Sequence, residues 1–154
     1  NLAGLIISGV FLKPGSSIPT ALKPVVRLIS ILFPKMGLTV IDATTISKDK
    51  AVVDAYVNDP LVYRGKIPAR LAAEMSKAMD RMRSQLPRIN LPTIIMHGTD
   101  DRLSNPQGSQ ILYDRVGSRD KTLKLYKGLY HEIFNEPGHL QVMADLEGWL
   151  TAHL

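Results

Sequence analysis

The organisation of this chain follows from residues 91–103, which read LPTIIMHGTDDRL. A proline precedes a short apolar run, and the run ends at a glycine that is followed by polar residues. This pattern is typical of a strand buried on both faces of a parallel sheet, with proline at its start. Residues 2–8 form a similar apolar run, for which we also expect burial on both faces. Residues 121–126 alternate polar and apolar side chains. We therefore predict three strands.

Helical patterns separate these strands. Proline stands at the start of the segments 24–33, 68–86, 105–116 and 137–154, and a shorter helical stretch is expected over 49–57. We expect the last helix to bury five apolar residues, Leu140, Met143, Leu146, Trp149 and Leu150. Strands that alternate with helices predict an α/β fold with a parallel sheet.

Three strands are few for such a sheet, and one apolar edge would stay uncovered. The first strand also opens the chain with no initiator methionine and no signal-type pattern before it. We therefore expect the chain to be part of a longer protein.

Residues 24–33 predict a helix that is apolar nearly all round, since only Arg27 and Ser30 are polar. At this length it falls far short of the ~20 residues that span a bilayer. Two interpretations stay open: the helix packs in the core, or it is a lid helix that lines an acyl-chain tunnel.

The helix expected from Pro68 carries one apolar stripe, formed by Leu71, Met75, Met79, Met82 and Leu86. Such a stripe is either plain core or an adaptable wall for a flexible ligand. Arg70 and Glu74 lie four residues apart on another face, where they predict an ion pair.

Composition indicates one ordinary globular domain, with 45% hydrophobic and 21% charged residues among 154. The net charge of +5 is uneven, because residues 13–90 hold 13 Lys and Arg against 6 Asp and Glu, whereas the rest holds 6 against 8. This basic segment is a solvated helix face or a surface that meets anionic lipid. Aromatic residues are not interleaved with its cations, so we expect no nucleic-acid partner.

The chain has no cysteine, which excludes disulfides and thiolate metal sites. Its Asp and His residues lack clustered ligand spacing, so we expect no metal and no organic cofactor. Absence of cysteine fits a reducing compartment, and we expect a cytoplasmic protein with peripheral contact to a membrane.

Two loops at strand ends carry the residues suited to catalysis. Asp101 lies in the loop after the second predicted strand, and His131 follows the third. The carboxyl ends of parallel strands share one edge of a sheet, so the two side chains can meet there. A carboxylate that holds an imidazole in one tautomer prepares its other nitrogen to act as a base. The order Asp101 then His131 also matches the last two places of nucleophile, acid and histidine in α/β-hydrolases.

Several stretches extend this match to a family. They are residues 42–49 (DATTISKD), 56–61 (YVNDPL), 97–103 (HGTDDRL), 120–126 (DKTLKLY) and 128–131 (GLYH). In them the chain resembles the C-terminal part of monoacylglycerol lipases and of the lysophospholipase-like bacterial enzymes close to them. This resemblance implies part of an α/β-hydrolase parallel sheet with a helical cap insertion. It implies a core strand over residues 1–12, the cap over 13–90 and the C-terminal core over 91–154.

The same resemblance implies a role for three residues. Asp101, rather than its neighbour Asp100, would be the catalytic acid, His131 the general base, and Tyr56 a residue facing the glycerol end of the substrate. His97, His139 and His153 are expected to be structural or exposed.

No G-x-S-x-G nucleophile elbow and no HGGG-type oxyanion segment occurs in the sequence. We therefore expect a serine ester hydrolase that needs a missing N-terminal half for its nucleophile, and negligible activity of this chain alone. Its substrate would be a monoacylglycerol or another single-chain lipid ester, and its cap would touch membranes peripherally. Open alternatives are a lysophospholipase, a carboxylesterase, a proline-iminopeptidase-like enzyme, or a degenerate hydrolase domain without catalysis.

Overall fold

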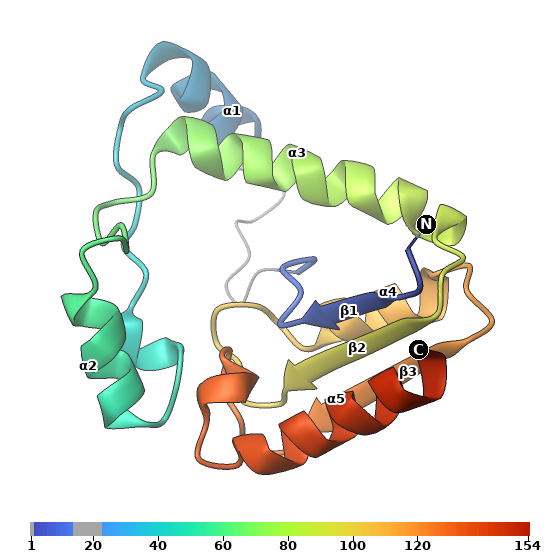
Figure 1. Cartoon of the computed structure of the whole chain (residues 1–154). Coiled ribbons are helices and arrows are strands. Elements are labelled where there is room, and N and C mark those ends of the chain that lie inside the picture. The colour runs from blue at the N-terminus through green and yellow to red at the C-terminus, as the bar shows by residue number, and fades with distance from the viewer. Residues whose placement is uncertain (1, 14–22) are drawn as a thin grey trace.

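A computed structural model describes residues 2–13 and 23–154, and its centre is a three-stranded parallel sheet (Figure 1). The strands are β1 (Leu5–Ser8), β2 (Thr93–Gly98) and β3 (Lys121–Tyr126), in the spatial order β1-β2-β3. Both pairings are parallel. All three carboxyl ends therefore lie at one edge, as the sequence predicts for an α/β fold.

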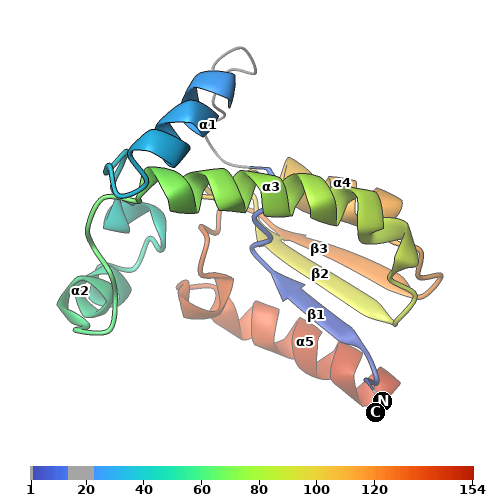
Figure 2. The same ribbon diagram turned by 90° about the horizontal axis from the view of Figure 1, so that it is seen from above.

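Five α-helices and three short 3₁₀ helices surround the sheet in the described part of the chain. They are α1 (Lys23–Leu32), η2 (Ala43–Thr45), α2 (Lys50–Asn58), α3 (Ala69–Gln85), η3 (Leu86–Arg88), α4 (Gln107–Arg115), η4 (Ile133–Asn135) and α5 (His139–His153). The predicted helices are confirmed, with ends that differ by a few residues. Seen from above, α4 and α5 cover opposite faces of the sheet (Figure 2).

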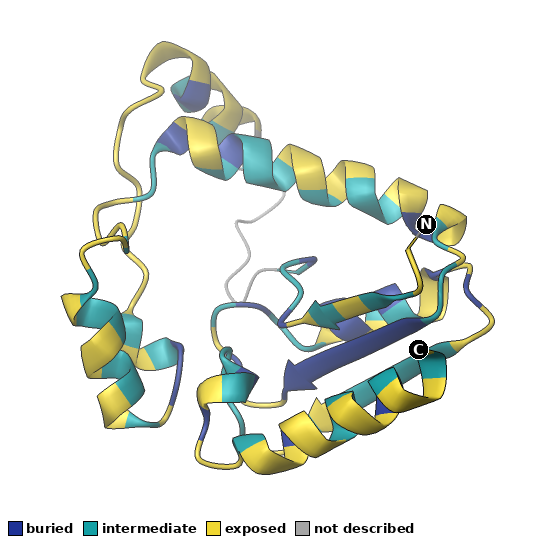
Figure 3. Cartoon of the chain, in the orientation of Figure 1, coloured by how far each residue is buried: buried dark blue, intermediate teal, exposed yellow. Residues whose placement is uncertain are grey.

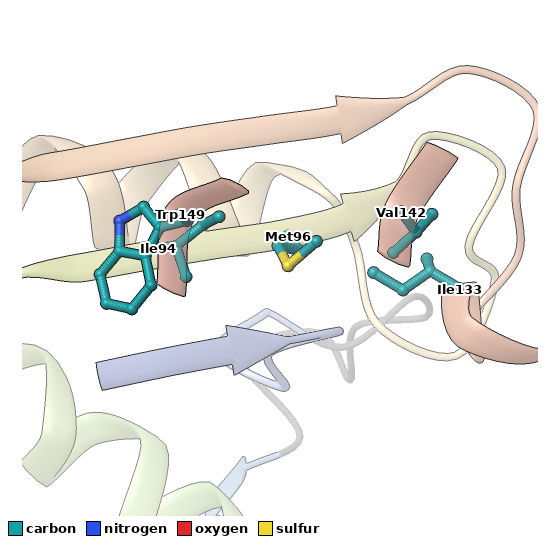
Figure 4. Packing of buried hydrophobic residues seen from close by; sticks show 5 residues of the cluster. All are labelled: Ile94, Met96, Ile133, Val142 and Trp149. Atoms are coloured by element: carbon teal, nitrogen blue, oxygen red, sulfur yellow. The ribbon is translucent and has the colours of Figure 1, made fainter. Parts of the chain in front are cut away.

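The central strand β2 has all six residues buried and divides the core into two clusters. Ile94 and Met96 point to the α5 side, where they pack with Ile133, Val142 and Trp149 (Figure 4). Ile95 belongs to the second cluster, together with Leu12, Leu86 and Leu112. Successive side chains of a strand point to opposite faces, so the apolar residues of β2 alternate between the two clusters.

The prediction that the first strand is buried on both faces is wrong. Ile6 is 44% exposed and Leu2, before the strand, is 76% exposed. No described strand pairs with the outer edge of β1, so the apolar run meets solvent there. A hollow of about 170 Å³ opens beside it, lined in part by Ala3, Gly4 and Trp149.

Helix α1 packs against α3, yet it leaves most of its apolar surface uncovered. Ser30 is buried, whereas the apolar residues Val25, Leu28, Ile31 and Leu32 are each at least half exposed. The core interpretation of this helix is therefore wrong for those residues. A helix that is apolar all round can cover only one side against a single neighbour.

Helix α5 buries a different stripe from the one predicted. Val142 is fully buried and Trp149 nearly so, but Leu140 is 74% exposed and Met143 49% exposed. The prediction that Leu140 and Met143 are buried is wrong, because the face centred on Val142 and Trp149 meets the sheet. Figure 3 shows the contrast between the exposed outer side of α5 and the buried β2.

Residues 23–88 form a helical segment that extends past the carboxyl ends of the strands, with α1 and α2 on that side of the sheet (Figure 1). The predicted Arg70–Glu74 ion pair is confirmed, with 2.8 Å between Nε and Oε1. The predicted apolar stripe of α3 is less buried than expected, because its first residue, Leu71, is 49% exposed. Among the described helices none is both long and apolar enough to cross a bilayer.

Candidate active site

The loop that leaves β2 holds the carboxylate of Asp101 by backbone donors. Its Oδ1 accepts the N–H groups of Leu103 and Ser104 at 2.8 and 3.0 Å. Asp side chains commonly bond backbone groups two and three residues ahead in this way, which fixes the side chain within its own turn. The Asp101 side chain is fully buried, so its other oxygen meets only protein groups.

The loop that leaves β3 is tied to the Asp101 loop before it reaches His131. Asp100 donates its backbone N–H to the carbonyl of Leu129 at 3.0 Å. A Cβ on Gly98 would come within 2.3 Å of the carbonyl oxygens of Leu129 and Tyr130. Glycine at the end of β2 therefore permits an approach of the two loops that a side chain would block.

These loops bring Asp101 and His131 into contact, as predicted. The imidazole Nδ1 lies 2.7 Å from Asp101 Oδ2, across 30 residues of sequence. An ionised carboxylate can only accept, so Nδ1 carries the proton and donates it. Nε2 is then the nitrogen with a free lone pair, and the ring is 29% exposed. The arrangement holds one imidazole nitrogen and leaves the other ready to take a proton.

Charge at the pair is stabilised in both partners. Burial raises the pKa of Asp101, but hydrogen bonds from His131, His97 and Ser104 outweigh it and hold that pKa well below its usual range. The hydrogen bond to Asp101 raises the pKa of His131 above its ordinary value, against the opposing effect of burial. The nearby charge of Glu132 raises it further. Asp101 is thus an anion, and it favours the imidazolium.

The turn after β1 completes the floor of the site. Gly9 has a φ of 55°, and a Cβ there would lie 3.0 Å from Cε1 of the His131 ring. The Gly9 carbonyl oxygen lies 3.1 Å from the Ser104 hydroxyl. Glycine is suited to this position both for its backbone conformation and for the space that the imidazole needs.

Ser104 is close to the pair but is not placed to be a nucleophile. Its hydroxyl lies 2.8 Å from Asp101 Oδ2 and 3.2 Å from His131 Nδ1, the nitrogen that already donates to the acid. The residue is also completely buried. A serine nucleophile would have to approach Nε2 from the exposed side of the ring.

Sequence reasoning missed the part that His97 has in this network. Its ring is fully buried, and its Nε2 lies 2.9 Å from Asp101 Oδ2. Two signals were available: His97 shares a strand face with Ile95, and it stands four residues before the acid. Neither signal alone reveals the contact, because that depends on how the loop turns back.

The other histidines make local structural contacts. His139 Nδ1 lies 2.8 Å from the carbonyl of Glu136, and His153 stacks on Trp149 with ring centroids 4.2 Å apart. Asp100 is exposed and lies 3.5 Å from Lys48 Nζ. The contact to His131 thus belongs to Asp101 and not to its neighbour.

Tyr56 lies half-buried on α2. Within the described residues its hydroxyl has no hydrogen bond to Asp101 or His131, so its role at the substrate stays a prediction. Residues 2–13 and 23–154 contain no group of three His, Cys, Asp or Glu arranged to hold a metal ion.

The helical segment docks on the His131 loop through residues 46–48. Lys48 donates its backbone N–H to Glu136 Oε1 at 2.6 Å, and Glu132 donates its own to the carbonyl of Ile46 at 2.9 Å. Ile46, Ser47 and Glu136 are each at most 2% exposed. The segment is therefore anchored within a few residues of His131.

Comparison with known proteins places this geometry in context. The family model described as "Serine aminopeptidase, S33" matches residues 1–138. A monoacylglycerol lipase of Mycolicibacterium smegmatis is 36% identical over 152 residues, which is 99% of this chain and 54% of that protein. The chain spans about half the length of the curated relatives it matches, with 54% and 49% for two of them.

Solved structures agree on the fold. The monoacylglycerol lipase of Paleococcus ferrophilus superposes with a TM-score of 0.87 at 27% identity, covering 99% of this chain and 60% of that one. A soluble variant of the monoglyceride lipase of Saccharomyces cerevisiae, in complex with a substrate analog, gives 0.80 at 27% identity, covering 99% and 54%. The three strands therefore form part of an α/β-hydrolase sheet.

Proposed function

Since the chain belongs to the serine aminopeptidase S33 family of α/β-hydrolases, we propose that it supplies the acid and the base of a serine ester hydrolase. Its substrates would be monoacylglycerols or similar single-chain lipid esters. The observation that carries this proposal is the 2.7 Å contact between Asp101 Oδ2 and His131 Nδ1 at the carboxyl ends of the strands. That contact leaves Nε2 free to serve a nucleophile.

In this mechanism His131 Nε2 takes the proton of a serine hydroxyl as the serine oxygen attacks the ester carbonyl. The imidazolium then gives that proton to the departing alcohol, which leaves an acyl-serine. Water attacks the acyl-serine while Nε2 again accepts a proton, and the imidazolium returns that proton to the serine oxygen as the fatty acid is released. Asp101 remains ionised throughout, where it orients the ring and stabilises its positive charge.

The serine would come from a segment outside these 154 residues. The sequence contains no G-x-S-x-G stretch, and Ser104 faces the wrong nitrogen of His131. In this proposal residues 1–12 and 91–154 belong to the hydrolase core. Backbone donors for the oxyanion would belong to the same outside segment as the serine.

Residues 13–90 would be the cap, which supplies the lipid-facing surface. The basic balance of this segment and the exposed apolar residues Leu28, Ile31 and Phe33 support peripheral contact with anionic lipid. Tyr56 lies in the same segment, half-buried on α2, and would contact the glycerol end of the substrate.

The proposal is tested by mixing this chain with a separately produced N-terminal half that carries the nucleophile elbow. Hydrolysis is measured with p-nitrophenyl esters, a monoacylglycerol, a lysophospholipid and a prolyl amide. We expect negligible turnover by either part alone, and monoacylglycerol turnover by the mixture that is lost with His131→Ala.

Other outcomes would overturn specific parts of the proposal. Turnover by the purified chain alone would contradict an outside nucleophile. Preference for the lysophospholipid or the prolyl amide would change the substrate class. An assembled mixture that hydrolyses nothing would indicate a hydrolase fold that has kept binding and lost catalysis.

A further inference from the structure

His97 is a fully buried histidine whose two ring nitrogens both face polar partners. Nδ1 lies 2.6 Å from the hydroxyl of Ser109 on α4, and Nε2 lies 2.9 Å from Asp101 Oδ2. Two further acceptors near Nε2, the carbonyl and hydroxyl oxygens of Ser104, are farther away, at 3.3 and 3.4 Å. His97 thus connects the acid of the site to a helix on one face of the sheet.

The partners of the ring determine its tautomer. A carboxylate accepts only, so Nε2 carries the proton and donates it to Asp101. Nδ1 is then an acceptor, and the Ser109 hydroxyl donates to it. Ser109 is itself fully buried, as is the ring that it faces. The Asp101 carboxylate, which can only accept, therefore determines the direction of both hydrogen bonds of the His97 ring.

The two oxygens of Asp101 are held from different sides. Oδ1 is bonded by backbone groups of its own loop, at Leu103 and Ser104. Oδ2 receives His131 at 2.7 Å, the Ser104 hydroxyl at 2.8 Å and His97 at 2.9 Å. Among the described residues, His97 is the donor to the carboxylate that comes from the sheet, so it links the rotation of the carboxylate to the buried strand β2.

A purely space-filling role accounts poorly for this residue. Its neighbours along β2 are apolar, and burial of an imidazole costs free energy unless both nitrogens are satisfied. An apolar residue would fill the position without that requirement. The full satisfaction of the ring, with one bond to the acid, indicates a function in holding Asp101.

We propose that His97 is a positioning residue that directs Oδ2 of Asp101 toward His131, with Ser109 fixing the tautomer that can donate. This inference rests on the proposed function, in which His131 is the base. It concerns only how the acid is held, and it can be measured without turnover.

Two variants of His97 form a matched pair. His97→Gln places an amide N–H near the position of Nε2 and keeps a donor to Asp101, whereas His97→Leu keeps the bulk and removes the donor. The His131 Nδ1 proton is followed by NMR in the full 154-residue chain. The kcat and KM values are measured in the active mixture with the nucleophile-bearing half.

We expect His97→Leu to shift or broaden the downfield Nδ1 proton signal of His131. We expect it to lower kcat by roughly tenfold, with KM unchanged, since a hydrogen bond to a charged group is lost. His97→Gln should recover most of the signal and of kcat. Ser109→Ala should produce a smaller change of the same kind, and it provides the test if His97→Leu does not fold.

The inference is overturned if folded His97→Leu, or Ser109→Ala in its place, keeps the native His131 proton signal and the native kcat. Equal losses in the Gln and Leu variants would also overturn it, because the donor would then be irrelevant. If no mixture turns over substrate but the proton signal changes as expected, the proposed function fails while the positioning role of His97 stands.

Discussion

Residues 91–154, the buried part of the molecule, and residues 23–88, its exposed part, differ in how far they bury their apolar side chains. In residues 91–154 the central strand β2 is wholly buried, and both carboxylate oxygens of Asp101 are hydrogen-bonded. In residues 23–88 the helix α1 exposes most of its apolar side chains, although it packs on α3. Residues 91–154 thus hold the Asp101 carboxylate within the fold, whereas residues 23–88 present apolar surface outward.

Under the proposed function, this difference would separate two tasks of a lipid hydrolase. An acid and a base need fixed geometry, which the buried network around Asp101 provides. Contact with a lipid needs exposed apolar surface next to positive charge, which the helical segment provides. Residues 46–48 join the two, because they dock on the loop that follows His131.

The largest expected effect is on the acid. Asp101→Asn removes the negative charge and presents an amide to three donors, so the His131 ring loses its tautomer and orientation. We expect kcat of the active mixture to fall by about 10⁴-fold. The exposed neighbour variant Asp100→Asn is the matched control and should stay within about twofold. Similar losses of kcat in the Asp101→Asn and Asp100→Asn variants would show that the buried position of Asp101 has no special effect on catalysis.

The role of the exposed part, residues 23–88, is tested at α1. Replacing Leu28 and Ile31 together with serine removes apolar groups that are 56% and 60% exposed. We expect binding to anionic vesicles, measured by sedimentation, to weaken by about tenfold. Leu140→Ser on α5 removes a leucine that is 74% exposed, more than either of these residues, outside the segment, and it should leave vesicle binding unchanged. Equal weakening in both would show that exposure anywhere on the chain suffices.

The contact between residues 46–48 and the segment that follows His131 depends on Glu136. Glu136→Ala removes the buried carboxylate whose Oε1 accepts the Lys48 amide at 2.6 Å. We expect the free energy of unfolding to fall by about 1–3 kcal/mol and the Lys48 amide to lose protection from hydrogen exchange. Exposed Glu147→Ala on α5 serves as the control. Unchanged exchange at Lys48 would mean that residues 46–48 are held by other contacts.

The smallest effect concerns the pH dependence of the base. His131 must be neutral to accept a proton, and its pKa is raised, so kcat/KM should fall below a midpoint that lies above about 6.5. The contribution of His131 to stability has the opposite trend. It is fully present below the unfolded pKa and is lost as pH rises through the raised folded pKa.

Glu132→Gln refines this prediction, because the charge of Glu132 adds to the raised pKa of His131. We expect the acid midpoint of kcat/KM to move to lower pH, because the negative charge that favours the imidazolium is removed. Glu147→Gln is the control and should leave the midpoint in place. A midpoint that does not move with Glu132→Gln would show that the charge of Glu132 does not raise the pKa of His131.

Much of the buried part, residues 91–154, can be predicted from the sequence. The order of strands and helices, and the meeting of Asp101 with His131, follow because parallel strands place their terminal loops at one edge. The pair Arg70–Glu74 follows from helical spacing alone. These features depend on local pattern and on one topological rule.

The remaining features depend on neighbours that a local pattern does not identify. Ile6 is exposed because no described strand covers β1, and Leu140 is exposed because α5 turns its Val142 face to the sheet. An all-round apolar helix such as α1 gives no information on which face is covered. His97 was missed for a similar reason, since its link to Ser109 joins a strand to a helix across the core.

The central claim is that this chain provides the base that activates a serine on another segment. A direct test is the rate at which a fluorophosphonate labels the serine of the nucleophile-bearing half, because labelling requires no particular substrate. We expect fast labelling with the native chain. With His131→Ala we expect a slow rate, close to that of the half alone. Equal labelling rates with native and His131→Ala chains, in mixtures shown to assemble, would contradict the account.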